Sequence, residues 1–160
     1  TIETLVEAGA DLEKDSFQNL TPLALAISEG FRWASAALIE AGASIDHSFG
    51  KERLTPLMVL ATRTVASSRN ARVNGGPSII EIAEMLVDRG ADVNAATEHG
   101  VTALMIAAGA ENNTMLAYLL KAGADPEMKT GDGRTALDIA ELSRSTQSAR
   151  ALRVLGRFNN

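Results

Sequence analysis

The chain has 160 residues, of which 46% are hydrophobic and 22% are charged, with a formal net charge of −5 and no cysteine. This length suits one domain with a hydrophobic core of its own. The lack of cysteine excludes disulfide bonds and thiolate metal sites. The acidic balance disfavours nucleic-acid binding, and no apolar run reaches the ~20 residues of a membrane-spanning helix.

Residues 1–11 are interpreted as the end of a helical unit. Ile2, Leu5 and Val6 form an apolar stripe, and Gly9-Ala10 follows it, where Gly favours the end of a helix. The first helix of this unit is missing, so we interpret 1–11 as a partial repeat. We expect a longer protein that continues upstream; the alternative is an array that starts with an incomplete unit.

Residues 12–44 are predicted to form the first complete unit. Thr21-Pro22 indicates a helix start, because Thr can cap a helix and Pro suits its first position. An inner helix is expected at 23–28 and an outer helix at 32–40. Trp33, the only tryptophan, is expected to pack against the outer-helix side; the alternative is an exposed Trp that binds a partner.

Residues 45–92 form a unit with about 14 extra residues. The segment 66–78 carries the loop signals Asn-Gly, Gly-Gly and Pro, so it is predicted to be an insertion between the two helices. The inner helix is expected to run to about Ser68. The outer helix is predicted at 79–88, with Ser78 and Glu81 in capping-box spacing.

The insertion is also basic. Residues 53–80 contain no acid and four arginines, Arg53, Arg63, Arg69 and Arg72. Such a segment can bind an acidic partner segment or a phosphate. The alternative is a solvated loop whose arginines keep it soluble.

Residues 93–125 and 126–158 form the last two units. In the first of them Leu104, Leu119 and Leu120 have helical spacing and are expected to be buried. The outer helix of 126–158, expected at 146–154, is poorer in large apolar residues. We therefore interpret 126–158 as a C-terminal capping repeat, which needs a polar outer face.

Two sequence markers recur along the chain. Thr-x-Leu begins at residues 21, 55, 102 and 135, and Gly-Ala begins at 9, 42, 90 and 123. Most of these intervals are 33 or 34 residues, and one helix pair of this size cannot bury its own apolar face. On these motifs the chain resembles the ankyrin repeat family, over nearly its whole length.

This resemblance implies an all-α fold, a solenoid of stacked helix-turn-helix units with short β-hairpin or turn tips. Residues 1–160 would then be a single ankyrin repeat domain. The family pattern has His after Thr-Pro-Leu, where this chain has Ala24, Met58, Met105 and Asp138. Met58 and Met105 are expected to fill the core; the alternative is an adaptable binding surface.

The resemblance also implies a non-catalytic interaction module that binds a protein or peptide through its hairpin tips and inner-helix surface. An intracellular, cytoplasmic monomer without cofactor is expected. The alternative is a targeting or regulatory module of a larger enzyme or effector protein; phospholipid or nucleic-acid binding through arginines is a third. By register, the partner-binding residues would be Phe17, Gln18, Leu20, Ser28, Glu29, Lys51, Glu52, Leu54, Thr62, Arg63, Glu98, His99, Val101, Asp132 and Arg134. Arg69 and Arg72 of the insertion are added as partner-binding residues because of their charge.

Three further patterns bear on chemistry. His47 and His99 fall on predicted tips without carboxylates in metal-ligand spacing, so exposed tips rather than a metal site are expected. Gly131-x-Gly133 matches a dinucleotide fingerprint only formally, because it lies on a predicted tip rather than in a βαβ unit. Asn94 resembles the site of the asparaginyl hydroxylase that modifies ankyrin repeats, and it is also the repeat's own consensus residue.

Overall fold

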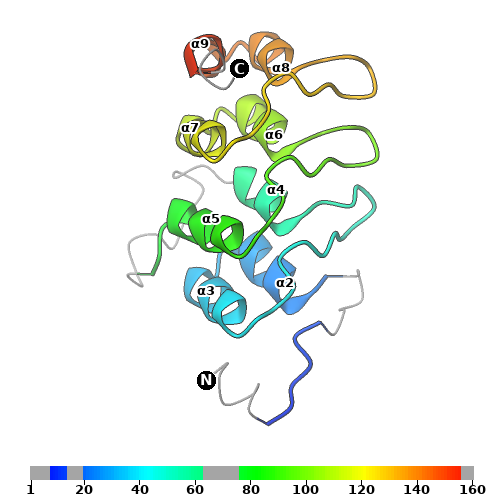
Figure 1. Ribbon diagram of the computed structural model, residues 1–160, viewed down its shortest axis with the longest axis vertical. Helices are drawn as coiled ribbons and strands as arrows, with labels where there is room; N and C mark the ends of the chain where they lie inside the picture. Colours follow the sequence, from blue (N-terminus) through cyan, green and yellow to red (C-terminus); the bar gives the residue numbers. More distant parts are fainter. Residues whose placement is uncertain (1–7, 14–19, 63–75, 156–160) are drawn as a thin grey trace. The chain divides into compact units, whose positions relative to one another are not determined.

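Helix pairs make up the regular structure of the computed structural model, which describes residues 8–13, 20–62 and 76–155 (Figure 1). Within these residues, pairing between extended segments is limited to two isolated bridges, Phe49–Leu54 and Ala96–Thr102. The predicted all-α class is therefore confirmed. The helices are α2 (Pro22–Glu29), α3 (Arg32–Glu40), α4 (Pro56–Ala61), α5 (Ile79–Asp88), α6 (Ala103–Gly109), α7 (Asn113–Lys121), α8 (Ala136–Leu142) and α9 (Thr146–Leu155).

Threonine caps the first helix of each pair. The hydroxyl of Thr102 accepts from the backbone N–H of Met105 at 3.4 Å, and Thr21, Thr55 and Thr135 accept from the third residue after them in the same way. Each bond satisfies a donor that has no partner inside the helix. The helix starts predicted from the Thr-x-Leu marker are therefore confirmed.

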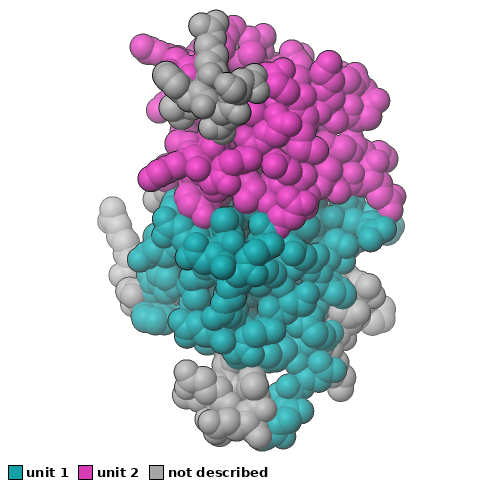
Figure 2. All heavy atoms as spheres, in the orientation of Figure 1, with its two compact units in different colours: residues 1–60, 68–91 teal, residues 61–67, 92–160 magenta. Residues whose placement is uncertain are grey.

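The contacts divide the chain into two compact units, coloured separately in Figure 2. Unit 1 comprises residues 1–60 and 68–91, and unit 2 comprises residues 61–67 and 92–160. In unit 1, α2 packs on α3, and α3 packs on α5. In unit 2, α6 packs on α7 and α8 on α9, while α6 also packs on α8 and α7 on α9.

The core of unit 2 comes from the apolar faces of α6 and α7. Leu104, Leu119 and Leu120 are at most 2% exposed, as predicted. Met105 of unit 2 and Met58 of unit 1 are also buried, which confirms their role as core residues. Burying one such large side chain stabilises the fold by about 1.5–3 kcal/mol.

The insertion between α4 and α5 differs from prediction at its start. The helix α4 ends at Ala61, and Thr62 lies in a turn. The prediction that this helix continues to about Ser68 is therefore wrong, because the helix stops before Thr62. Thr62 is β-branched, and β-branched residues lose side-chain freedom in a helix. Residues 63–75 lie outside the described part of the chain.

The return from the insertion agrees with prediction. The Glu81 backbone N–H donates to the Ser78 hydroxyl at 3.1 Å, and the Ser78 N–H donates to the Glu81 carboxylate. This reciprocal capping box starts α5 at Ile79. The pKa of Glu81 is lowered first by the bond from the Ser78 backbone N–H to its carboxylate and then by a hydrogen bond between the Ser78 side chain and the same carboxylate.

Candidate interaction surface

The tip before α6 is closed by Thr97, a buried residue. Its backbone N–H donates to the Val101 carbonyl at 3.0 Å, and its hydroxyl accepts from the Val101 N–H at 3.1 Å. Glu98 and His99 lie between these two residues and are exposed. The two bonds between Thr97 and Val101 thus fix the backbone of the tip, while the side chains of Glu98 and His99 are exposed to solvent.

The tip before α8 is closed in a similar way by Thr130. The Thr130 N–H donates to the Arg134 carbonyl at 2.9 Å, and the Thr130 hydroxyl accepts from the Arg134 N–H at 3.1 Å. Asp132 accepts from the Thr130 hydroxyl and pairs with Nε of Arg134 at 2.9 Å. The hydroxyl and then Arg134 lower the pKa of Asp132, so this exposed carboxylate is ionised at neutral pH.

A hydrogen bond joins the two tips of unit 2. The Gly131 N–H donates to the His99 carbonyl at 2.8 Å. Gly100 lies at this close approach with φ +73°, and a Cβ there would be 2.8 Å from the Lys129 carbonyl oxygen. Only glycine fits such a position without displacing backbone.

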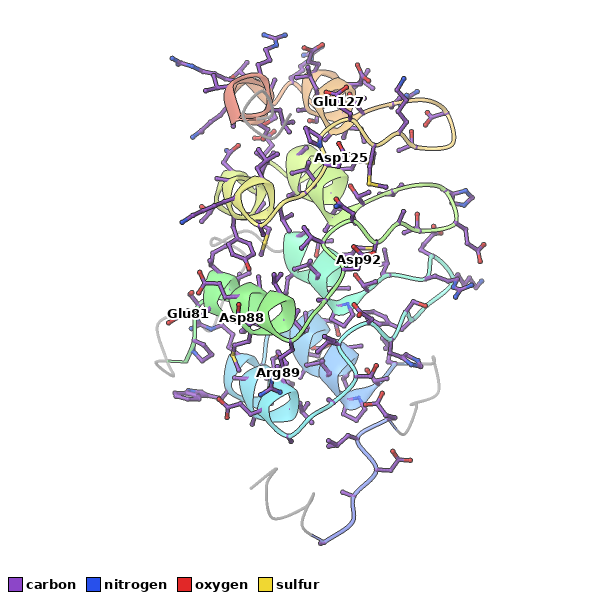
Figure 3. All side chains as sticks on the ribbon, in the orientation of Figure 1. Glu81, Asp88, Arg89, Asp92, Asp125 and Glu127 are labelled. Atoms are coloured by element: carbon purple, nitrogen blue, oxygen red, sulfur yellow. The ribbon has the colours of Figure 1, made fainter. Side chains whose placement is uncertain are left out.

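The segments that lead to the tips are also joined across repeats. The Asp125 N–H donates to Oδ1 of Asn94 at 2.8 Å, and Nδ2 of Asn94 donates to the Gly123 carbonyl at 3.3 Å. Figure 3 labels Asp92 and Asp125, whose carboxylates accept from the N–H two residues later, at 2.9 Å in each case. Such Asx turns set the path of the chain towards each tip.

Comparison with known proteins identifies the family. The model of a single ankyrin repeat matches residues 52–98, and the model of ankyrin repeats in many copies matches residues 86–140. Together they cover residues 52–140, which is more than half of the chain. The chain belongs to the ankyrin repeat family.

Two curated relatives extend this match to most of the chain. The B-cell lymphoma 3 protein homolog of Mus musculus is 28% identical over 143 residues, 89% of this chain and 29% of the relative. A putative ankyrin repeat-containing protein of Treponema pallidum (strain Nichols) is 27% identical over 144 residues, 88% of this chain and 43% of the relative. The chain thus spans less than half the length of either relative.

The predicted partner-binding residues of this ankyrin repeat chain, on the tips and at the ends of the inner helices, differ in their exposure. Among those described, Glu29, Lys51, Glu52, Thr62, Glu98, His99, Asp132 and Arg134 are exposed, whereas Leu20, Ser28, Leu54 and Val101 are half-buried. Leu54 pairs with Phe49, and Val101 closes the Thr97 tip, so both support the backbone. Phe17, Gln18, Arg63, Arg69 and Arg72 lie outside the described residues, and their binding roles stay predictions.

His47 differs from the expectation of an exposed tip. It is half-buried, with Nε2 inside the protein, in the segment just before buried Phe49. His99 is exposed as expected. Among the described residues, no three histidine, aspartate or glutamate side chains lie close enough together to hold a metal ion.

Trp33 is 61% exposed, so the expectation that it packs on the outer-helix side of the repeat is wrong. Buried Ser35, Ala36, Leu38 and Ile39 supply the packed face of α3, and Trp33 in its first turn is left outside that face. Its indole instead lies against Gly76, where a Cβ would be 3.1 Å from the ring.

Phe31 is an exposed apolar residue that the sequence reasoning missed. It occupies the N-cap of α3, is 54% exposed and makes no capping bond. Asn112 occupies the matching N-cap of α7 and accepts from the Met115 N–H at 3.2 Å. The sequence signal that could have revealed this exposed residue is Phe31 itself, an aromatic residue at an N-cap position, where polar residues are preferred.

Asn94, the predicted hydroxylation residue, is half-buried, and both polar atoms of its amide are hydrogen-bonded to backbone. Its modification stays a prediction. No helix within the described residues has the length and apolar character to cross a membrane.

Proposed function

We propose that this chain is a non-catalytic module that binds a protein or peptide through its hairpin tips and inner-helix surface. Ankyrin repeats generally mediate protein–protein interaction. The observation that carries the proposal is the 2.8 Å bond from Gly131 to His99, which joins the tips of successive repeats. It places Glu98, His99 and Asp132 at the exposed ends of a backbone that is already ordered.

This ordering favours binding for a physical reason. A partner that docks on a mobile loop must also offset the entropy lost when that loop becomes fixed, and a preformed surface avoids this cost. In unit 2 the tips are held by Thr97 and Thr130, by the bond between them and by Gly100. Charged tip residues then contribute mainly to partner selection and association rate.

Site-specific photo-crosslinking tests the proposal. The photoreactive amino acid p-benzoylphenylalanine is placed at His99 in one sample and at Ala117, exposed on α7, in the control. Both proteins are irradiated in lysate, and covalent adducts are identified by mass spectrometry. Adducts that form from position 99 and not from 117 support the proposal; adducts from 117 alone, or equally from both, contradict it.

A module that serves a longer protein is the second candidate. The two curated relatives are longer than the aligned region, which makes up 29% and 43% of their lengths. In this case the tips would bind a target and bring it to an activity located elsewhere in the protein, or they would regulate that activity. Mass determination of the endogenous protein, detected with an antibody against 1–160, tests it: a mass above 16.8 kDa is required.

A further inference from the structure

The helix α8 carries charges at positions that are apolar in the preceding repeat. Asp138 and Glu141 lie 33 residues after Met105 and Ala108 of α6. Met105 and Ala108 are at most 2% exposed, and α8 packs on α6, whereas Asp138 and Glu141 are exposed. An apolar helix placed on this face of α8 would remove two carboxylates from water without a partner for either, which is costly.

The same face borders an open hollow of about 420 Å³, lined by Arg134, Asp138, Glu141 and Leu142. The last three residues have the i, i+3 and i+4 spacing that places side chains on one side of a helix. Leu142 is 63% exposed, the largest value among the large hydrophobic residues that the structure describes as exposed. The hollow therefore combines an apolar contact with carboxylates beside it.

The charges around the hollow favour a cation. Asp138 accepts from the Thr135 N–H at 2.8 Å and from its hydroxyl, and these bonds lower its pKa, so its carboxylate is charged at neutral pH. Arg134, the one base in the lining, is paired with Asp132, and the charges of Lys129 and Arg134 also contribute to the lowered pKa of Asp138. Glu141 pairs with Arg153 of α9, and both side chains are about half exposed or more.

We propose that this hollow binds a peptide segment in which an arginine or lysine stands beside a large apolar residue. The apolar side chain covers Leu142, and the cation reaches Glu141 and Asp138. The inference rests on the proposed function, since it assumes a peptide-binding module, and it adds a subsite on α8 with a stated ligand chemistry. Arg153 competes with the ligand cation for Glu141, because an exposed pair is weak enough to exchange.

The test uses a blocked hexapeptide of alternating leucine and arginine, with a leucine–glutamate hexapeptide as control. Binding to ¹⁵N-labelled protein 1–160 is followed by amide shifts in NMR spectra. Shifts centred on residues 134–142 with the first peptide, and none with the second, are expected. Shifts confined to the tip around His99 would overturn the α8 subsite and leave the proposed function standing.

Three variants give effects of different sign. Leu142→Ser should weaken binding about tenfold, through loss of apolar contact. Glu141→Gln should weaken it roughly two- to fivefold, and Arg153→Ala should tighten it by a similar factor, because an exposed charge pair contributes that much. Unchanged binding in Leu142→Ser, or weaker binding in Arg153→Ala, would overturn the proposal. Thermal unfolding of each variant checks that the fold is retained.

Discussion

Asn94 holds the backbone of Asp125, 31 residues further along the chain, through a 2.8 Å hydrogen bond from the Asp125 N–H to its Oδ1. Its Nδ2 donates to the Gly123 carbonyl of the same segment. In unit 1, Glu13 accepts from the Ser44 N–H at the same separation of 31 residues. In these two repeats, one side chain therefore holds the backbone at the start of the next repeat.

Replacing Asn94 by alanine should destabilise the protein by about 1–2 kcal/mol, because two hydrogen bonds to backbone are lost. Glu127 is the matched control: it stands 33 residues later at the same repeat position and is exposed. Glu127→Ala should change the free energy of unfolding by less than about 0.5 kcal/mol. Urea unfolding followed by circular dichroism measures both, and equal losses would show that the Asn94 bridge contributes nothing specific.

Leu119→Ala should cost about 2–5 kcal/mol, the range for large-to-small changes in a core. Leu119 is 0% exposed on α7, where it packs within unit 2. Leu142→Ala removes the same atoms from a side chain that is 63% exposed, so a change within about 0.5 kcal/mol is expected. Chemical denaturation compares the pair, and similar losses would contradict the assigned register.

Gly100→Ala should destabilise more than Gly123→Ala. Both glycines have positive φ, +73° and +95°, so alanine at either is strained by about 1–2 kcal/mol. A Cβ at Gly123 meets nothing within 4 Å, whereas one at Gly100 meets the Lys129 carbonyl at 2.8 Å. Gly123→Ala therefore measures only the cost of the positive φ, without a steric clash. Thermal unfolding midpoints rank the two, and the reverse order would show that the tips are not in close contact.

Phe31→Asn should stabilise unit 1 by about 1 kcal/mol, the usual gain from a polar N-cap. The backbone is already suited to a cap: Phe31 has φ −77° and ψ 77°, and Asn112 has φ −81° and ψ 72°. Asn112→Ala is the reciprocal change and should lose a similar amount. Unfolding curves of the two variants should move in opposite directions; a destabilised Phe31→Asn would mean that the phenyl ring contributes more than its exposure suggests.

Stability should fall in acid, and Asp138 should contribute to the fall. Its pKa is lower in the folded protein than in the unfolded chain, so the unfolded chain binds more protons near pH 4 and folding is favoured as pH rises. The contribution is complete above the ordinary aspartate pKa and is lost as pH falls through the lowered folded value. Urea midpoints between pH 7 and pH 3 should fall less steeply in Asp138→Asn; identical slopes would contradict the assignment.

Much of the fold was predictable because its signals are local. A Thr hydroxyl reaches an N–H three residues away, and the spacing of Leu119 and Leu120 defines one helix face within a few residues. The capping box of Ser78 and Glu81 is equally short in range. Since every repeat carries such signals in the same register, the period alone determined the helix pairs, their starts and the burial of Leu104, Leu119 and Leu120.

The features of the candidate surface depend on neighbours far away in the chain. The close approach at Gly100 exists only because the Lys129–Gly131 segment lies against it, and His47 is half-buried by its surroundings rather than by its tip sequence. Trp33 sits in a helical pattern that suits packing, yet the packed face of α3 leaves it exposed. Helix periodicity shows which residues share a face, whereas burial requires a second surface, and only the tertiary structure decides whether that surface is present.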